Sequence, residues 1–257
     1  MKVAIIGYGH VGKAMHQLFP TAVIYDKHLG IGSMEEANLC DLAFVCVPTP
    51  MREDGGCNTS IVEEVIEWLQ CKIIVLRSTV SVGFTDYAKE KYNKRIVFQP
   101  EYYGETVAHP FADLRHQNWL SFGGSAEDIE LVISAYQSVI NSNVKINIYP
   151  AKEVELAKYM ENAFFAMKVT FCNEFYDIAK AMGVNYNICR EVWLSDPRIG
   201  SSHTFVYPEN RGYGGSCLPK DIAAIVFQGQ EKHVDTDLLD AVIRKNAKYK
   251  GQKNENK

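Results

Sequence analysis

The chain has 257 residues, of which 47% are hydrophobic and 23% are charged, and its net charge is −4. This composition is typical of a globular protein, and the acidic balance gives no electrostatic basis for binding nucleic acid. No leader-like stretch precedes the first apolar run, and no run is long enough to span a membrane, so we expect a cytoplasmic protein without a membrane partner. The seven cysteines lack C-x-x-C pairs and metal-like spacing with histidine, which favours reduced thiols and predicts no metal site.

Short apolar runs alternate with amphipathic stretches over residues 1–150. The predicted strands are 2–6, 22–25, 42–47, 72–76, 95–98, 119–122 and 144–148. Ser60 followed by Glu63, and Ser125 followed by Asp128, are typical of helix N-termini. Continuous apolar strands separated by helices predict an α/β fold, a Rossmann-like, doubly wound parallel sheet.

The pattern changes after Pro150. Residues 151–182 contain neither proline nor glycine, and apolar side chains recur there at helical spacing. We expect one long helix that ends at Gly183, followed by shorter helices at 185–194, 220–229 and 235–248. The predicted organisation is therefore an α/β domain over 1–150, a small helical domain over 151–250 and a polar tail over 251–257.

A glycine motif near the N-terminus predicts a dinucleotide site. Gly7, Gly9 and Gly12 form G-x-G-x-x-G after the first predicted strand, with His10 and Val11 at the start of the following helix. The glycines permit a tight turn, close approach of a pyrophosphate and close packing of helix on strand, while the helix N-terminus offers N–H groups to phosphate. A glycine turn in an α/β fold without a ligand is the alternative.

Polar residues at later strand ends extend this prediction. Asp26 ends the second strand, about 20 residues after the glycines, where a carboxylate binds the ribose 2′-hydroxyl and repels a 2′-phosphate, so NAD is favoured over NADP. Thr49 follows the third strand, and Ser78 and Thr79 follow the fourth. Since ligands lie beyond the carboxyl ends of such strands, we expect these residues to face the cofactor. Helix capping is the alternative for Ser78 and Thr79.

Cys217 is the candidate nucleophile. Glycines and Ser216 precede it, and Leu-Pro-Lys-Asp follows it and can begin a helix. A thiol near a cation and a helix N-terminus loses its proton more easily, which makes it a nucleophile. Together with a nicotinamide cofactor, it suggests oxidation through a covalent thioester. The alternative for a lone cysteine is a small buried hydrophobe.

Two further segments carry polar side chains. Glu101 and Glu105 lie just after the fifth predicted strand, and Lys158 and Asn162 lie one turn apart on one face of the long helix. Taken singly, such carboxylates most often belong to a loop and such helix residues to a solvated surface.

The ordered set of motifs resembles the UDP-glucose/GDP-mannose dehydrogenase family, the nucleotide-sugar 6-dehydrogenases. The resemblance covers residues 1 to about 248. It rests on the glycine motif and on the segments VPTP (47–50), STV (78–80), PEYYGE (100–105), ELAKYMENAFFA (155–166), NE (173–174), DPRIG (196–200) and GGSCLPKD (214–221).

The resemblance implies five catalytic residues. Cys217 would be the nucleophile, and Lys158 and Asn162 would stabilise charge on the oxygen at the reacting carbon. Asp221 would position a water or act as a base, and Glu101 would be the base for thioester hydrolysis. The implied reaction is the four-electron oxidation of a nucleotide sugar, UDP-glucose to UDP-glucuronate, by two successive NAD molecules through a thiohemiacetal and a thioester. GDP-mannose and UDP-N-acetyl sugars stay open as substrates.

The resemblance also implies the binding residues. Thr79 would lie near the nicotinamide, Lys220 near the cofactor phosphates, and Glu105 on the cofactor side, supporting the substrate or a water network. The implied substrate contacts are Glu101, Tyr102, Tyr103, Lys158, Asn162, Arg198, Tyr213 and Gly214. Arg198 corresponds to an arginine that reaches the substrate of the neighbouring subunit, and the helix over 151–182 would form the interface of a homodimer.

Family members usually continue for more than a hundred further residues, in a second domain that helps to bind the nucleotide. Tyr207, Arg211 and Tyr213 could supply compensating substrate contacts. One alternative function is the single hydride transfer of a β-hydroxyacid dehydrogenase, which also pairs a helix-borne lysine with an asparagine but needs no cysteine. Another is a non-catalytic NAD-binding remnant or assembly partner.

Overall fold

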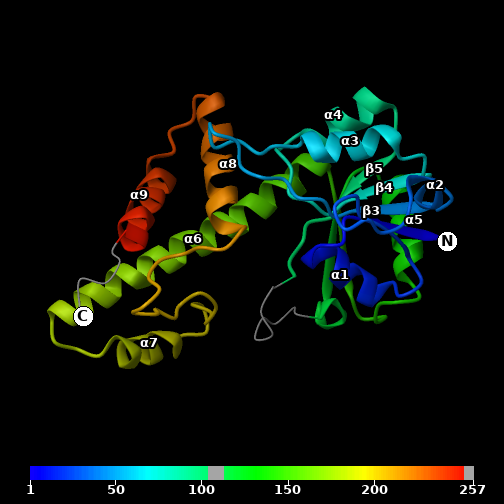
Figure 1. Cartoon of the computed structure of the whole chain (residues 1–257). Helices are drawn as coiled ribbons and strands as arrows, with labels where there is room; N and C mark the ends of the chain where they lie inside the picture. Colours follow the sequence, from blue (N-terminus) through cyan, green and yellow to red (C-terminus); the bar gives the residue numbers. More distant parts are fainter. Residues whose placement is uncertain (104–112, 252–257) are drawn as a thin grey trace. The chain divides into compact units, whose positions relative to one another are not determined.

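The computed structural model describes residues 1–103 and 113–251 (Figure 1). The chain forms two compact units. The first consists of Met1–Arg52 and Cys57–Lys158, and the second of Glu53–Gly56 and the chain from Tyr159 onward. The division falls inside helix α6 (Ala151–Ala181). Glu105 and nearly all of the predicted polar tail lie outside the described residues.

The first unit is built on one sheet. Its seven described strands have the order β2-β1-β3-β4-β5-β6-β7. They are β1 (Val3–Ile6), β2 (Val23–Tyr25), β3 (Leu42–Val45), β4 (Ile73–Leu76), β5 (Ile96–Phe98), β6 (Trp119–Gly123) and β7 (Lys145–Tyr149). The predicted Rossmann-like α/β fold is confirmed.

One strand pair departs from the predicted parallel arrangement. Phe98 of β5 pairs with Gly123 of β6 in the antiparallel sense, whereas the other neighbouring strands pair in parallel. A buried apolar strand has the same composition in either direction, so its direction follows from the connection that leads into it. The pattern of residues 119–122 predicted the strand and could not predict its direction.

Helices cover both faces of the sheet (Figure 1). Alternate residues of the central strands β1, β3, β4 and β5 enter opposite cores: Val3 and Ile5 pack in one, and Ala4 and Ile6 in the other. Helices α1 (His10–Leu18) and α5 (Ala126–Tyr136) contribute to the first core. Helices α2 (Met34–Asn38), α3 (Ser60–Trp68) and α4 (Phe84–Tyr92) contribute to the second. Strands buried on both faces explain the continuous apolar runs in the sequence.

The two predicted helix caps had different outcomes. Ser125 caps α5, where its hydroxyl accepts a hydrogen bond from the Asp128 N–H at 3.3 Å. Ser60 does not cap α3, because it is already the first helical residue and Thr59 occupies the N-cap position. The Thr59 hydroxyl donates to the Glu63 carboxylate at 3.3 Å, so the acid three residues after Ser60 serves the preceding threonine.

The second unit is helical. It contains most of α6, followed by α7 (Tyr186–Leu194), α8 (Leu218–Glu231) and α9 (Asp237–Gly251), close to the predicted ranges. Gly183 takes a φ of +70° just after α6, and the Val184 N–H closes the helix end on the Ala179 carbonyl at 2.9 Å. A core of this unit contains the buried residues Ala163, Ala166, Tyr213, Ile222 and Val242. Among the described residues, no helix has the length and apolar character needed to cross a bilayer.

Candidate functional site

The three glycines of the N-terminal motif meet different demands. Gly7 has a φ of +90°, and a Cβ at Gly12 would lie 2.0 Å from the Gly7 carbonyl oxygen, so the turn itself excludes side chains at both positions. Gly9 is the N-cap of α1 with a φ of −75°, and a Cβ there would meet no described atom within 4 Å. The folded chain therefore does not require a glycine at position 9. Open space at a helix N-terminus fits the approach of a pyrophosphate.

The residues beside Gly9 begin helix α1. His10 is its first residue and is exposed, whereas Val11 is partly buried against the core on the α1 side of the sheet. Both lie in the first turn, where backbone N–H groups have no partner within the helix.

Asp26 follows β2 and is held by backbone donors. One carboxylate oxygen accepts from the Tyr8 N–H at 2.7 Å, and the other accepts from the N–H groups of His28 and Leu29, both at 2.9 Å. Burial raises the pKa of Asp26, but these backbone hydrogen bonds outweigh burial and hold the pKa below its usual value. The ionised carboxylate is thus fixed directly beside the glycine turn, and it fits the ribose hydroxyls of NAD.

Thr49, Ser78 and Thr79 connect the ends of β3 and β4. The Thr49 hydroxyl donates to the Thr79 carbonyl at 2.8 Å, and the Ser78 hydroxyl donates to the Val47 carbonyl at 2.6 Å. Neither Ser78 nor Thr79 caps a helix, since the N-cap of α4 is Gly83. The capping alternative is therefore wrong for both. The residues lie at the carboxyl edge of the sheet, as predicted.

A second group of predicted residues lies after β5. The Glu101 carboxylate forms a salt bridge with Arg77 and accepts a hydrogen bond from the Tyr103 N–H. Next to Glu101, the ring of Tyr102 lies beneath the ammonium of Lys158, with 4.9 Å from Nζ to the ring centroid. The first unit therefore brings Glu101, Tyr102, Tyr103 and Lys158 together.

Sequence reasoning missed two charged residues of this region. Arg77 ends the apolar run of β4 and is buried, and Glu155 is buried on α6 one turn before Lys158. Arg77 interrupts a buried strand run, and Glu155 shares its helix face with the buried residues Val154 and Tyr159. A charged residue at such a position is the sequence signal that could have identified them.

The cysteine loop belongs to the second unit. Cys217 is exposed and occupies the N-cap position of α8, with Pro219 in the first turn as predicted. Its Sγ lies 3.7 Å from the Ser216 hydroxyl, and its carbonyl accepts from the Asp221 N–H at 2.9 Å. The alternative of a small buried hydrophobe is wrong for this thiol. Gly215 has a φ of +81°, a conformation that favours glycine in the loop.

Asp221 connects the cysteine loop to helix α6. Its side chain is 1% exposed. The carboxylate accepts a hydrogen bond from the Asn162 amide at 2.5 Å and forms an ion pair with Lys220. Asn162 lies one turn after Lys158 in α6. Lys220, a predicted neighbour of the cofactor phosphates, forms an ion pair with Asp221.

The remaining predicted substrate residues differ in exposure. Tyr213 is buried in the helical core, and burial raises the pKa of its hydroxyl to about 12. The backbone of Tyr213 exchanges hydrogen bonds with the Asn246 amide at 2.8 and 3.1 Å. Arg198 is 86% exposed and forms a two-point salt bridge with Asp196. A Cβ at Gly214 would lie 3.4 Å from the Lys250 ammonium.

Arg211, which we named as one of the compensating substrate contacts, contacts other residues of the second unit. Its guanidinium donates to the Asn173 side chain at 2.6 Å, the Asn173 carbonyl at 2.8 Å and Asp177 at 2.9 Å. It also lies over the rings of Tyr176 and Tyr249. These contacts tie the loop before Cys217 to α6 and α9 through the Nε and one terminal nitrogen of Arg211.

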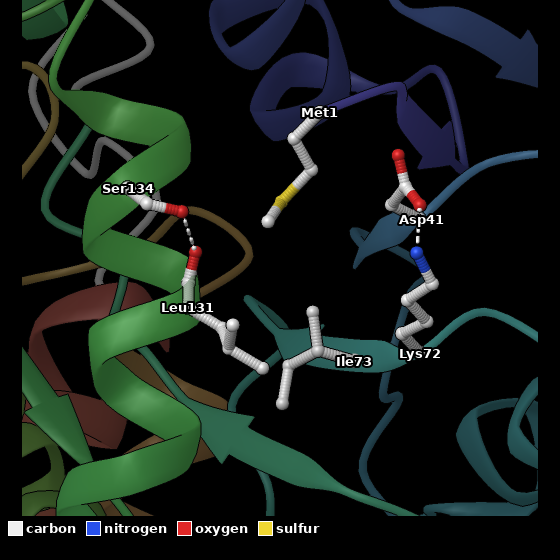
Figure 2. A pocket seen from close by; sticks show the side chains of 6 residues that line it. All are labelled: Met1, Asp41, Lys72, Ile73, Leu131 and Ser134. Atoms are coloured by element: carbon white, nitrogen blue, oxygen red, sulfur yellow. Dashed lines mark hydrogen bonds and ion pairs between the residues drawn. The ribbon is translucent and has the colours of Figure 1, made fainter.

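A hollow of about 390 Å³ occurs at the opposite edge of the sheet. Its lining residues are Met1, Asp41, Lys72, Ile73, Leu131 and Ser134 (Figure 2). Met1, Asp41 and Lys72 directly precede or lie near the starts of β1, β3 and β4, whereas dinucleotides bind beyond the carboxyl ends. The Asp41–Lys72 ion pair, 2.7 Å long, lies on its rim. This hollow is therefore separate from the candidate cofactor site.

Two family models match the chain in the order of its two parts. The NAD binding domain of the UDP-glucose/GDP-mannose dehydrogenase family matches residues 16–140, and the central domain of the same family matches residues 152–248. The chain belongs to this family. Its cofactor is NAD, and Gly9, Asp26 and the start of α1 fit that dinucleotide. The glycine turn lies just before the matched range, so its assignment stands on the geometry described above.

Individual relatives of the dehydrogenase family agree with this result. The chain is 30% identical over 227 residues to a UDP-glucose 6-dehydrogenase of Pseudomonas aeruginosa, covering 82% of this chain and 49% of that protein. It is 29% identical to a UDP-glucose 6-dehydrogenase of Streptococcus pneumoniae, covering 96% and 73%. The chain thus spans about half the length of most of the curated relatives it matches.

A solved structure shows the same fold. The UDP-glucose dehydrogenase of the hyperthermophilic archaeon Pyrobaculum islandicum superposes with a TM-score of 0.82 at 23% sequence identity, covering 96% of this chain and 68% of that chain. At this identity the likeness concerns the fold alone. It accounts for the order of the family elements, a Rossmann-like sheet followed by a long helix.

Proposed function

We propose that this chain carries the catalytic residues of an NAD-dependent nucleotide-sugar 6-dehydrogenase that oxidises UDP-glucose to UDP-glucuronate. The observation that carries the proposal is an exposed thiol, Cys217, at the N-cap of α8 in a chain with an NAD-binding domain. Single hydride transfer has no use for this thiol. Four-electron oxidation uses it to hold the carbon between two oxidation steps.

Bound NAD supplies the hydride acceptor, and two NAD molecules in succession take up the four electrons that separate a primary alcohol from a carboxylate. The chain's own residues hold the carbon. The Cys217 thiolate adds to the aldehyde carbon, which forms a thiohemiacetal, and the second oxidation converts this adduct to a thioester. The covalent bond keeps the aldehyde from escaping while the cofactor is exchanged.

Lys158 and Asn162 would stabilise the oxygen on the reacting carbon. Lys158 supplies a buried ammonium, and Asn162 supplies an amide whose orientation is set by Asp221. Donors that are already oriented stabilise developing negative charge without reorganisation. Asp221 in this proposal orients Asn162 and Lys220, and its burial and two cationic or amide partners support orientation over proton transfer.

Glu101 would direct water to the thioester. Within the described residues, two of its four lone-pair positions are taken, by Arg77 and by the Tyr103 N–H, and acceptor capacity for a water remains there. The neighbouring Tyr102, Tyr103 and Lys158 are proposed to contact the sugar, with Arg198 and the Gly214 loop as further contacts. Glu105 and Lys220 stay predicted cofactor-side residues.

Two features support an assembly and a compartment. Helix α6 exposes Phe171, Phe175 and Ile178 in the second unit, which supports a homodimer formed through this helix. No disulfide joins cysteines within the described part of the chain, which is consistent with the proposed cytoplasmic compartment. UDP-glucose is proposed as substrate because the relatives above are named for it.

Counting NADH tests the proposed reaction. With UDP-glucose, the purified chain should release two NADH per molecule of uronate, and Cys217→Ser should lose at least about 100-fold in turnover because the covalent step is removed. Product and NADH are measured in the same quenched samples by chromatography and absorbance.

Cys189→Ser is the matched control, because Cys189 is also an exposed thiol of the second unit. It should behave like the unaltered chain. One NADH per product, or full activity in Cys217→Ala, would instead indicate the single hydride transfer of a β-hydroxyacid dehydrogenase. NAD binding without turnover of UDP-glucose or GDP-mannose would indicate a non-catalytic protein.

A further inference from the structure

A buried arginine spans two strand ends of the first unit. Arg77 directly follows β4, and its side chain is 3% exposed. The Nη1 atom donates to the carbonyls of Gln99 and Pro100, at 3.3 and 3.2 Å, and the Nη2 atom pairs with the Glu101 carboxylate. Arg77 therefore binds three consecutive residues of the chain as it leaves β5.

The pair is charged and largely excluded from water. The Glu101 side chain is 11% exposed. Burial lowers the pKa of Arg77, but the Glu101 carboxylate outweighs burial and raises it above its usual value, so the guanidinium stays ionised. Apolar residues of similar volume usually stabilise a fold as well as a buried ion pair does. Stability alone thus gives no reason for this pair.

The orientation of the pair is defined by geometry that only arginine provides. A planar guanidinium donates in several fixed directions at once, whereas an ammonium cannot reproduce the same fork. The second Glu101 oxygen accepts from the Tyr103 N–H, so the carboxylate is held from two sides. Tyr102 lies between Glu101 and Tyr103 in the sequence, and its ring lies under the Lys158 ammonium.

We propose that Arg77 is a positioning residue that holds the Glu101 carboxylate in place for the hydrolytic half of the reaction. The inference rests on the proposed function. In that step water adds to the thioester carbon, the carbon–sulfur bond breaks, and Cys217 leaves as thiolate. Both water protons go to solvent, the first by way of Glu101. The two hydride transfers do not use the pair.

The test compares Arg77→Lys, Glu101→Gln and the double variant in the full chain with UDP-glucose and NAD. Rapid mixing measures the NADH burst, and intact-protein mass detects the sugar nucleotide held on Cys217. We expect each variant to keep a burst of two NADH per site, to accumulate the adduct and to lose about 100-fold in steady-state turnover. The double variant should lose no more than Glu101→Gln, because both changes remove one function.

Arg95→Lys is the matched control. Arg95 lies at the other end of β5 and pairs with Asp128, so the same exchange there should leave burst, adduct and turnover unchanged. NAD affinity, measured by calorimetry, should stay within about threefold in every variant. Three outcomes would overturn the inference. They are a turnover loss in the double variant equal to the product of the two single losses, an absent adduct on Cys217, or a lost NADH burst.

If Arg77→Lys does not fold, Glu101→Asp replaces it as the test of carboxylate placement. It keeps the charge but withdraws the carboxylate by one methylene, and adduct should accumulate if placement matters. Wild-type turnover in Glu101→Asp would overturn the inference while leaving the proposed function intact. An unaltered chain that releases one NADH per product, or none, overturns the proposed function and the inference with it.

Discussion

Single residues of the glycine turn separate the demands of folding from those of the cofactor. The turn requires Gly7 and Gly12 for reasons inside the chain, namely a positive φ at the first and a backbone contact at the second. Gly9 has neither constraint. The position that the fold leaves free is therefore the one at which the ligand sets the residue type.

Gly9→Ala should weaken NAD binding, whereas Gly12→Ala should lower the stability of the fold. Gly9→Ala should change the free energy of unfolding by less than about 1 kcal/mol, the range of N-cap exchanges, and weaken NAD at least about tenfold by filling the open space. Gly12→Ala should lose more than about 2 kcal/mol through overpacking. Urea unfolding and calorimetric NAD titration measure both. Unchanged NAD affinity in Gly9→Ala would contradict the assignment of the open space to pyrophosphate.

At the scale of elements, buried carboxylates join helices to other segments of the first unit. Glu155 of α6 accepts from the Gly83 N–H at 2.5 Å, the Thr85 N–H at 2.9 Å and the Thr85 hydroxyl at 2.6 Å. It thereby caps α4 from another helix, because Gly83 has no side chain to do so. Burial raises the pKa of Glu155, and these donors offset only part of that effect.

Glu155→Ala should destabilise the chain strongly. It leaves the two buried donors of Thr85 and the partly buried Gly83 N–H without an acceptor, and each such group costs about 1–3 kcal/mol, so a loss of at least about 3 kcal/mol is expected. Glu153→Ala, an exposed change two residues earlier on α6, should stay within about 0.5 kcal/mol. Urea unfolding followed by circular dichroism measures both, and equal losses would contradict the capping role.

Asp128 joins α5 to its neighbours in a pH-dependent way. Its N–H donates to the Ser125 hydroxyl, and its carboxylate pairs with Arg95 at 2.5 Å and Lys89 at 3.2 Å. Burial raises the pKa of Asp128, but these hydrogen bonds and ion pairs together lower it below its usual value. A depressed folded-state pKa stabilises the fold above the unfolded pKa of about 3.9, and this contribution disappears as the pH falls through the folded value.

Asp128→Asn should therefore lose about 2 kcal/mol at pH 7, and the loss should shrink as the pH falls below about 4. Unfolding free energies of the two proteins at pH 7, 5, 4 and 3 give the comparison. Glu127→Gln, whose partner contact is solvent-exposed, should show little difference at any pH. A difference that stays constant down to pH 3 would argue against the ionised pair as its source.

At the scale of the whole molecule, helix α6 leaves an apolar face uncovered. Phe171, Phe175 and Ile178 are between 40% and 48% exposed, and Ile188 of α7 is 63% exposed. Contiguous exposed apolar residues of this kind are typical of protein interfaces. A homodimer formed through this face, as proposed above, would bury them.

Phe175→Asp should convert the proposed dimer to a monomer, because it places a charge within the apolar face. Lys180→Glu, an exposed charge change five residues later on α6, should leave the dimer intact. Sedimentation equilibrium gives the mass of each species. An unaltered chain that sediments as a monomer would rule out the proposed interface.

Local patterns determined most of the elements and part of the site. A sequence directly displays spacings of two to four residues and the positions of glycines. These spacings indicated the strands buried on both faces, and the glycines indicated the N-terminal turn and the end of α6 before Gly183. The carboxyl-edge location of Thr49 and Thr79 followed from the same pattern and the general rule for parallel sheets.

Only the tertiary structure decided which charged and polar groups contact one another. Arg77 pairs with Glu101 across 24 residues, Asn162 with Asp221 across 59, and Glu155 with Thr85 across 70. The antiparallel direction of β6 belongs to the same class. Such contacts form because chain segments that are distant in sequence pack together, and no periodicity within one segment records its partner.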